Sequence, residues 1–290
     1  NVKSLVWYNP ANFKAAGLTV PKTDADMTKL TATIKSKKLG YPWCIGIESG
    51  GATGWAATDW MEEYVLRYGG EAEYTAWWKG KLAWSSPTVQ KAAKKFAEVA
   101  LTPGNVNGGG KAIAATGFGA TANLFATDKN KCFMMRQGSF ITDFFPDAVK
   151  AEYKANNFTR VGVFKLPAPA GTTDAVLGGG DLAAAFDANP ATQKVLNFIL
   201  SDKLGTGAML ATYPSYLSAH KTFPSAGYKN PITKNIAGIL STAKLFGFDG
   251  SDLAPAVVNA TEWTELTNWI AGKKTQKQAF DAIDASWKKA

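Results

Sequence analysis

Histidine and cysteine are almost absent from this chain of 290 residues, which contains only His220, Cys44 and Cys132. Structural zinc sites need about four Cys or His ligands at short spacings, so a Cys/His metal site is not expected. The chain also lacks a GxSxG nucleophile elbow, a GxGxxG fingerprint and a P-loop. His220 lies in a polar stretch and is interpreted as a surface residue. These absences leave no motif for nucleophilic catalysis or nucleotide binding, and no cofactor is predicted.

Long apolar runs are missing as well. No run approaches the roughly 18 residues that a membrane span requires, and no signal-peptide pattern opens the chain. The content of 46% hydrophobic and 19% charged residues is that of an ordinary globular protein, long enough for one large domain or two lobes. The net charge is +9, but the lysines occur in ones and twos along helical patterns. We interpret them as solvated helix faces, and no nucleic-acid partner is predicted.

Aromatic residues are abundant, at 12% with 10 tryptophans. A β-favouring run over residues 43–47 enters a glycine-rich loop, which leads into a helix that is expected to end at Gly70. The loop and the helix start carry Trp55, Glu48 and Asp59, whereas Trp60 shares an apolar stripe of the helix and is assigned to the core. Flat apolar rings beside fixed hydrogen-bonding groups suit a neutral, hydroxyl-rich ligand. This stretch therefore predicts one wall of a sugar site.

Other interpretations of these residues stay open at this point. Glu48 and Asp59 have the residue types of a glycosidase acid–base pair. The favoured interpretation is that they form hydrogen bonds to a ligand, or that Asp59 is an acidic residue at a helix N-terminus. Residues 178–180 are three glycines, which favour a turn or a close backbone approach. Arg136 and Gln137 end a predicted strand and offer planar donors, with a structural ion pair as the alternative.

The two cysteines, Cys44 and Cys132, stand 88 positions apart, and each follows a β-type or turn segment. Two buried free thiols and a disulfide are both compatible with this spacing. A disulfide would indicate an oxidising compartment. The spacing alone does not decide between them.

Strand and helix patterns alternate along the chain, which predicts α/β layers. Strands are expected at residues 4–8, 43–47, 131–136, 160–166 and 175–177, with a further extended run at 182–186. Helices are expected at residues 24–37, 88–101, 116–125, 141–156, 190–200 and 275–287. Beyond Gly205 the chain is expected to be mainly helical.

Six stretches, taken in order, resemble the family-1 extracellular solute-binding proteins of carbohydrate ABC transporters, in particular their α-glucoside-binding branch. They begin with VWYNPANFKAAGLTVPKT and include CFMMRQGSF and VLGGGDLAAAF. Their positions are residues 6–23, 43–70, 132–140, 163–169, 176–186 and 251–275. The resemblance implies an α/β, periplasmic-binding-protein type II-like fold of two lobes. A sugar would bind between the lobes and pass to a membrane permease, without enzymatic chemistry.

The resemblance also implies which residues contact the ligand. The loop after the second strand, the corner after Gln137, the glycines before Asp181 and the C-terminal tryptophan match contact regions of the family. Cys44 and Cys132 flank two of these walls, and a disulfide between them is predicted. The predicted ligand contacts are Glu48, Ser49, Trp55, Asp59, Arg136, Gln137, Phe140, Gly179, Gly180, Asp181 and Trp263.

The first lobe is predicted to be incomplete, because family members carry about one hundred residues, the size of a small lobe, before the motif that starts here at Leu5. We expect a ligand-binding C-terminal lobe that starts at a hinge strand (1–160), a segment of the incomplete N-terminal lobe (161–219) and a C-terminal helical region (220–290). The second segment would then lack strand partners, and sugar affinity would be weak or absent.

The expected location is periplasmic or extracellular. The expected partners are a carbohydrate and ABC permease subunits, with membrane contact only through the permease or a lipid anchor on the missing N-terminus. A glycoside hydrolase and a non-binding remnant are the alternatives.

Overall fold

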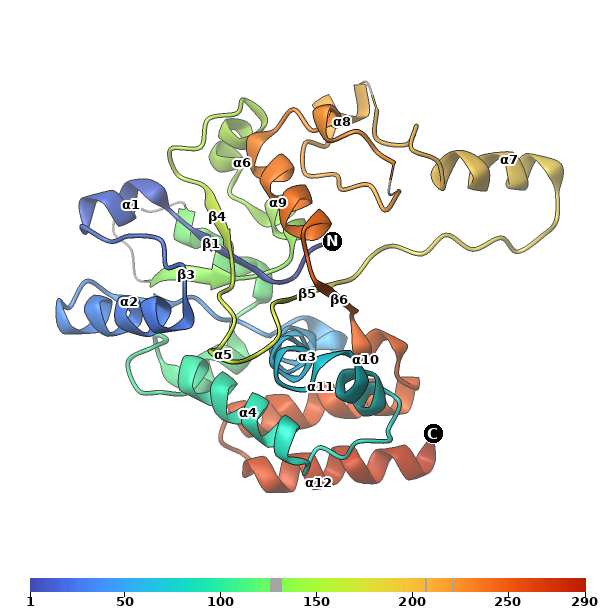
Figure 1. Ribbon diagram of the computed structural model, residues 1–290. Helices are drawn as coiled ribbons and strands as arrows, with labels where there is room; N and C mark the ends of the chain where they lie inside the picture. The colour runs from blue at the N-terminus through green and yellow to red at the C-terminus, as the bar shows by residue number, and fades with distance from the viewer. Residues whose placement is uncertain (126–131, 207, 221) are drawn as a thin grey trace.

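A four-stranded mixed sheet forms the centre of the molecule in the computed structural model, which describes residues 1–125, 132–206, 208–220 and 222–290 (Figure 1). Its strand order is β2–β3–β1–β4. β1 runs antiparallel to both β3 and β4, and β2 is parallel to β3. The strands are β1 (Leu5–Tyr8), β2 (Tyr41–Trp43), β3 (Cys132–Arg136) and β4 (Gly162–Lys165).

Alternate residues of β1 point to opposite faces of this sheet, and each face has its own apolar core. Val6 belongs to a large cluster with the α3 helix, whereas Leu5 and Trp7 belong to a second cluster with Phe145 and Tyr153. This two-residue alternation is the normal geometry of a strand. A strand buried on both faces explains why Leu5–Tyr8 has an uninterrupted apolar sequence.

The larger core surrounds a long helix, α3 (Trp55–Trp78), which packs against α4 (Pro87–Ala100), α10 (Gly250–Leu253) and α11 (Ala256–Ile270). Its aromatic rings form a chain of contacts: Phe96 lies 6.0 Å from Trp60 and 5.6 Å from Trp269, between ring centroids. Trp60 is buried, so its assignment to the core is confirmed. α12 (Gln276–Ser286) covers α11.

A second, smaller sheet pairs β5 (Ala175–Gly178) with β6 (Leu245–Phe248) in parallel. The N-terminal residues lie along the other side of β5, where the Lys3 backbone N–H donates to the Leu177 carbonyl at 2.8 Å. β5 lies against α3. The ends of β5 and β6 therefore meet near the start of the chain.

The remaining helices surround the central sheet, except for α7 (Pro190–Ile199), which stands away from the body (Figure 1). They are α1 (Pro10–Ala15), α2 (Asp24–Ser36), α5 (Gly109–Ala115), α6 (Asp147–Lys154), α8 (Ala208–Thr212) and α9 (Pro231–Ser241). Short 3₁₀ helices lie at Gly50–Ala52, Phe118–Phe125, Ser139–Phe144, Ser225–Gly227 and Trp287–Lys289.

Several local expectations are corrected. The helix expected at residues 141–156 is divided, because Pro146 ends the 3₁₀ turn and precedes α6. Residues 182–186 are exposed and form no strand, and β6 lies in a region that was expected to be helical. The break at Gly70 is confirmed: its φ of 64° is left-handed and interrupts α3. The predicted segment boundaries at residues 160 and 219 stay a prediction. β4, which lies just after the first of them, pairs with β1 in the central sheet.

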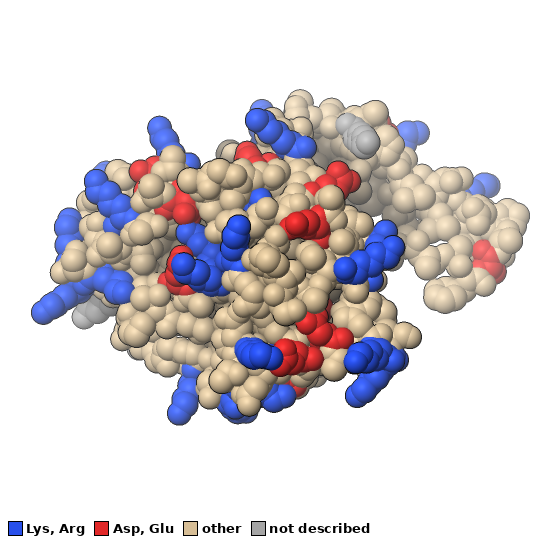
Figure 2. Space-filling model, turned by 60° about the horizontal axis from the view of Figure 1, so that its bottom comes forward, with Lys and Arg blue, Asp and Glu red and all other residues tan. Residues whose placement is uncertain are grey.

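Charge is dispersed over the face shown in Figure 2, where Lys and Arg occur singly or in small groups with Asp and Glu between them. The lysine spacing in the sequence predicted such a distribution. Among the described residues, no helix combines the length and apolarity needed to cross a membrane.

Candidate functional site

A pocket of about 290 Å³ opens where the ends of β5 and β6 meet the start of α3. Segments distant in sequence converge here: the N-terminal residues, the first turn of α3, the glycines after β5, the turn after β6 and one tryptophan of α11. The lining residues are Asn1, Lys3, Ala52, Trp55, Thr58, Asp59, Phe140, Gly179, Gly180, Asp181, Asp249, Ser251, Asp252 and Trp263.

Gly54 brings two walls of the pocket together. It precedes α3 with a φ of 118°, and a Cβ atom at this position would lie 2.3 Å from the carbonyl oxygen of Trp263. Only glycine allows this backbone conformation and this close approach. As a result, α3 starts directly against α11, and Trp55 and Trp263 line the same pocket.

The Trp55 ring lies within an aromatic cluster. Its centroid is 4.8 Å from that of Phe118, in an edge-to-face arrangement, and 5.7 Å from that of Phe140. The Lys3 ammonium lies 5.5 Å from the Trp55 ring centroid, within the range of a cation–π contact. The two neighbouring rings and the Lys3 ammonium together hold the Trp55 ring in place.

A buried ionic network lies beneath these rings. Lys3 Nζ donates to Asp59 at 2.8 Å and also to Asp249 in a short contact. Arg136 lies 3.8 Å from Asp59 and donates to Glu63 at 2.8 Å. These side chains come from the chain start, α3, β3 and the turn after β6, so the network joins the segments that form the pocket.

Burial and pairing shift the pKa values of these groups in different directions. Burial alone would lower the pKa of Lys3, but the Asp59 and Asp249 carboxylates raise it above its ordinary value. Burial raises the pKa of Asp59 to about 6, against the opposing effect of Lys3. Burial would also raise the pKa of Asp249, yet Lys3 holds it below the usual range. Near neutral pH the Lys3–Asp249 pair is therefore charged.

Glu62 holds the turn after β6 from inside the protein. Its carboxyl oxygens accept the backbone N–H groups of Gly250 and Ser251 at 2.9 and 3.1 Å. Burial, with Asp249 and Asp59 nearby, raises its pKa well above the ordinary value, which favours a protonated Glu62. Ligand oxygens of Asp59, Glu62 and Asp249 lie within 4.8 Å of one another, as in a metal site. The Lys3 ammonium bonds to two of the three carboxyl groups and supplies the positive charge that a metal would bring.

The structure brings seven of the predicted contact residues to this pocket: Trp55, Asp59, Phe140, Gly179, Gly180, Asp181 and Trp263. Four others, Glu48, Ser49, Arg136 and Gln137, are absent from its described lining, and their ligand roles stay predictions. Glu48 accepts the Gly50 backbone N–H at 2.7 Å. Arg136 forms the structural ion pair that was the alternative interpretation.

The sequence interpretation missed Lys3, Thr58, Asp249, Ser251 and Asp252. Lys3 directly precedes a predicted strand, and a strand end is a common place for a functional side chain, so this signal was available. The other signal was the run LFGFDGSDL, in which an Asp-Gly turn follows β-favouring residues. The expectation of helix beyond Gly205 concealed it.

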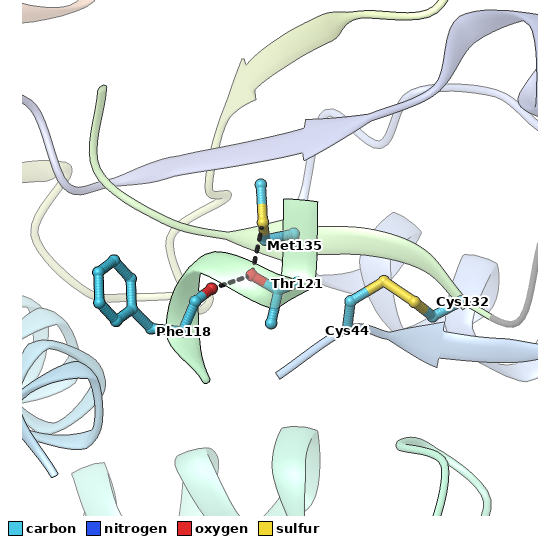
Figure 3. Close-up of a disulfide and its surroundings, with 5 residues drawn as sticks. All are labelled: Cys44, Phe118, Thr121, Cys132 and Met135. Carbon is cyan, nitrogen blue, oxygen red and sulfur yellow. Dashed lines mark hydrogen bonds between the residues drawn. A yellow bond between two sulfur atoms is a disulfide. The ribbon is translucent and has the colours of Figure 1, made fainter. Parts of the chain in front are cut away.

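Cys44 and Cys132 form a disulfide between the segment after β2 and the start of β3, with Cα atoms 5.4 Å apart (Figure 3). The Cys44 backbone N–H also donates to the Met134 carbonyl at 2.7 Å. The segment after β2 continues towards Trp55, and β3 continues towards Phe140. The disulfide thus links the two chain segments that carry these rings.

Comparison with known proteins assigns the family. Residues 1–206 match the bacterial extracellular solute-binding protein family. The chain belongs to this family. It is 36% identical over 288 residues to the α-glucosides-binding periplasmic protein AglE of Rhizobium meliloti and 33% identical over 289 residues to the osmoprotective compounds-binding protein GgtB of Synechocystis. It spans 61% and 66% of these two relatives, while 99% of the chain is matched in each case.

Solved structures confirm the fold class predicted from the sequence, an α/β fold of the periplasmic-binding-protein type II kind. A chitin oligosaccharide binding protein aligns with a TM-score of 0.76 at 20% identity, covering 100% of this chain and 69% of its own. The bacterial solute receptor AcbH, described as having an exclusive preference for β-D-galactopyranose, aligns with a TM-score of 0.77 at 18% identity, covering 100% and 71%.

Members of this family are binding proteins rather than enzymes. The comparisons give no support to the glycoside hydrolase alternative. The structure agrees, since Asp59 is held by Lys3 inside the pocket whereas Glu48 is absent from the pocket's described lining and bonds to its own loop.

Proposed function

We propose that this chain forms the sugar-contacting part of the substrate-binding component of an ABC importer, with a neutral α-glucoside-like ligand in the pocket beside Trp55. One observation carries the proposal: rings of Trp55, Phe140 and Trp263 line the same pocket as the carboxylates of Asp59 and Asp249. The C–H face of a sugar packs on aromatic rings, while carboxylates accept hydrogen bonds from its hydroxyl groups.

A partnerless donor also supports a polar ligand. The Trp263 indole N–H is buried without a hydrogen-bond partner among the described residues, on a side chain that lines the pocket. A buried donor without a partner is costly, and a bound hydroxyl oxygen would satisfy it. Lys3 uses two of its three N–H donors on carboxylates, which leaves one for a ligand.

The charge of the pocket favours neutral over anionic sugars. Asp59, Asp181, Asp249 and Asp252 line it together with one lysine, Lys3, which is already paired with two of them. An added carboxylate or phosphate on the ligand would meet like charge in a partly desolvated site. The disulfide is consistent with the periplasmic or extracellular location of such a receptor.

Saturation-transfer NMR with trehalose, maltose and glucuronate, each at millimolar concentration, tests the proposal. We expect weak binding of at least one neutral α-glucoside and a signal from glucuronate at least several-fold smaller. Trp55→Ala should weaken sugar binding about tenfold, equivalent to 1.4 kcal/mol. Trp287→Ala, directly after α12, is the matched control and should leave binding unchanged. Absence of binding by both neutral sugars, or equal binding by Trp55→Ala, would contradict the proposal.

A further inference from the structure

The helix α2 and the loop before it form a basic end of the molecule. Residues 14–38 contain six lysines and two aspartates, a net charge of +4 against +9 for the whole chain. α1 and α2 lie away from β6 and α7, at the left of Figures 1 and 2, where basic side chains project along the edge in Figure 2. Five of the six lysines are exposed: Lys14, Lys22, Lys29, Lys37 and Lys38.

Three of these lysines follow one stripe of α2, which we call the lysine face: Lys22, Lys29 and Lys37. Together with Asp26 and Thr33 they stand three or four positions apart, the spacing of neighbours on one side of a helix. Lys37 is the C-cap residue and keeps a helical backbone conformation. The lysine face is therefore a continuous surface along the whole helix.

Apolar side chains lie beside the lysine face. A groove of about 430 Å³ separates α2 from the loop of residues 17–21, and both Lys22 and Lys29 line it. Leu18 and Val20 line the same groove from the loop, and Val20 is 37% exposed. Cationic groups beside exposed apolar side chains are typical of segments that bind at a membrane–water interface.

The two aspartates of this stretch are already engaged. Asp24 forms an ion pair with Lys95 of α4, with an N–O distance of 2.7 Å. The Asp26 carboxylate accepts the backbone N–H groups of Lys22 and Thr23 at 3.2 and 3.0 Å, which completes the N-terminal cap of α2. Both carboxylates thus stabilise the fold, and the lysine face keeps an excess of positive charge.

Other surface helices balance their lysines differently. Lys94 and Lys277 each have an acidic partner one helical turn further on, at Glu98 and Asp281. On the lysine face the residues one turn after Lys29 and Thr33 are Thr33 and Lys37, which supply no negative charge. The excess charge is therefore a property of this face rather than of lysine-containing helices in general.

The residue types indicate which acidic partner fits. Specific recognition of carboxylates or phosphates relies on the planar donors of arginine, and binding of single-stranded nucleic acid adds aromatic rings that stack on bases. Residues 14–38 contain neither arginine nor an aromatic residue. Clusters of about four to eight basic residues on an amphipathic helix are typical of binding to anionic lipids.

We propose that the lysine face and the loop of residues 17–21 form a contact surface for a membrane that contains anionic phospholipids. The ammonium groups of Lys22, Lys29 and Lys37 would lie among the headgroup phosphates, and Val20 would enter the interfacial layer. The contact is reversible, because it depends on a few charges and one apolar loop. It is separate from the sugar pocket and independent of the proposed ligand, and it adds a direct membrane contact to those expected for the family.

Co-sedimentation with vesicles at low ionic strength tests the proposal. One set of vesicles contains equal parts of phosphatidylglycerol and phosphatidylcholine, and the other contains phosphatidylcholine alone. We expect the chain to bind only the anionic vesicles and to be released by added salt. The triple variant Lys22→Gln, Lys29→Gln and Lys37→Gln should bind at least about thirtyfold more weakly, because each lysine at such a surface contributes about fivefold.

A second triple variant removes the same charge elsewhere. Lys91, Lys273 and Lys288 are exposed and lie outside the basic end. Their joint replacement by glutamine should leave vesicle binding within about threefold of the native protein, because charges beyond a Debye length from the membrane are screened.

A dye at position 20 reports whether the loop enters the membrane. Both native cysteines are in the disulfide, so Val20→Cys carries a single environment-sensitive dye. We expect its emission to shift to the blue with the anionic vesicles and to stay unchanged with phosphatidylcholine alone. The same dye on Asp281→Cys, in α12, is the control and should keep its spectrum in both cases.

Four results would overturn the proposal. The first is absence of binding to the anionic vesicles. The second is an equal loss in the two triple variants, which would assign binding to net charge rather than to this face. The third is an unchanged dye spectrum at position 20 in vesicle-bound protein. The fourth is binding of polyphosphate without binding of vesicles, which would make a soluble polyanion the partner.

Discussion

Two helices of this protein, α3 and α7, differ in how much of their apolar side-chain surface is buried. Fourteen of the 24 residues of α3 are buried, whereas none of the ten residues of α7 is buried. Both helices carry large apolar side chains, and both begin where local signals put them: Gly54 at α3, Asn189 and Pro190 at α7. Helix starts are thus determined locally, while burial depends on whether a partner surface is present.

The same contrast applies to charge. Around α3, Lys3, Asp59, Glu63 and Arg136 are buried, and each has an oppositely charged partner. The segment of residues 182–200 that contains α7, called the arm below, has only Asp187 and Lys194, and both are solvent-exposed. Buried charges need partners because water no longer solvates them. The network near the pocket is therefore sensitive to single substitutions, and the arm is expected to tolerate them.

Paired phenylalanine substitutions should give the largest difference between the two regions. Phe96→Ala removes a ring that is 0% exposed and packs between Trp60 and Trp269. We expect it to lower the free energy of unfolding by about 3–5 kcal/mol. Phe198→Ala removes a ring that is 52% exposed and should change it by less than about 0.5 kcal/mol.

Urea unfolding followed by tryptophan fluorescence measures both values. Equal losses for Phe96→Ala and Phe198→Ala would mean that the arm is packed in solution, and the contrast between the two helices would fail.

A second pair of substitutions compares buried and exposed lysines. Lys3→Met removes the cation that the buried Asp59 and Asp249 share and leaves Asp59 only the more distant Arg136, so we expect a loss of about 3 kcal/mol at pH 7. Lys277→Met breaks an exposed pair with Asp281 and should cost less than about 0.5 kcal/mol.

The Lys3→Met loss should depend on pH. In the native protein Lys3 holds the pKa of Asp249 below its ordinary value, so the stabilisation by this pair is present above that value and declines as the pH falls. Thermal unfolding between pH 2.5 and pH 7 should show a smaller difference between variant and native protein at the acidic end, below the ordinary Asp pKa of 3.8. A pH-independent difference would mean that the loss comes from packing rather than charge.

Much of the central fold was predictable from the sequence. The strand at Leu5–Tyr8 and the helix that starts at Pro190 carry strong local signals, and both were found. β6 was missed because its four residues, LFGF, lie between two segments that form helices, α9 and α10. It forms by pairing with β5, some 70 positions away in sequence.

The site was predictable in part, for a related reason. Trp55 was identified because an aromatic residue beside glycine and acidic residues forms a visible pattern, and Trp263 was identified from the family resemblance. Lys3 and Asp249 were missed because they stand 246 positions apart and acquire their importance only when the fold brings them together. Conversely, Glu48 was predicted to contact the ligand because it is a carboxylate in the loop before Trp55. In the structure this carboxylate accepts the Gly50 backbone N–H within its own loop.

The smallest expected effect concerns a buried acid in α11. Glu262 is buried, and one of its carboxylate oxygens, Oε2, has no hydrogen-bond partner among the described residues. Burial raises its pKa to about 8, and Asp249 adds to the shift. The folded protein therefore keeps a proton that the unfolded chain releases, so stability falls as the pH rises from about 4.5 to 8.

Glu262→Gln keeps the shape of the side chain and removes this titration. Relative to the native protein, its free energy of unfolding should rise by on the order of 2 kcal/mol between pH 5 and pH 8. Glu71→Gln, the same change at an exposed position of α3, should stay within about 0.5 kcal/mol of the native protein at every pH. Urea midpoints at four pH values measure both trends. Parallel stability curves for the native protein and Glu262→Gln would show that Glu262 ionises in the folded protein as readily as in the unfolded chain. Burial of this acid would then carry no electrostatic cost, and this contrast between the α3 region and the arm would be lost.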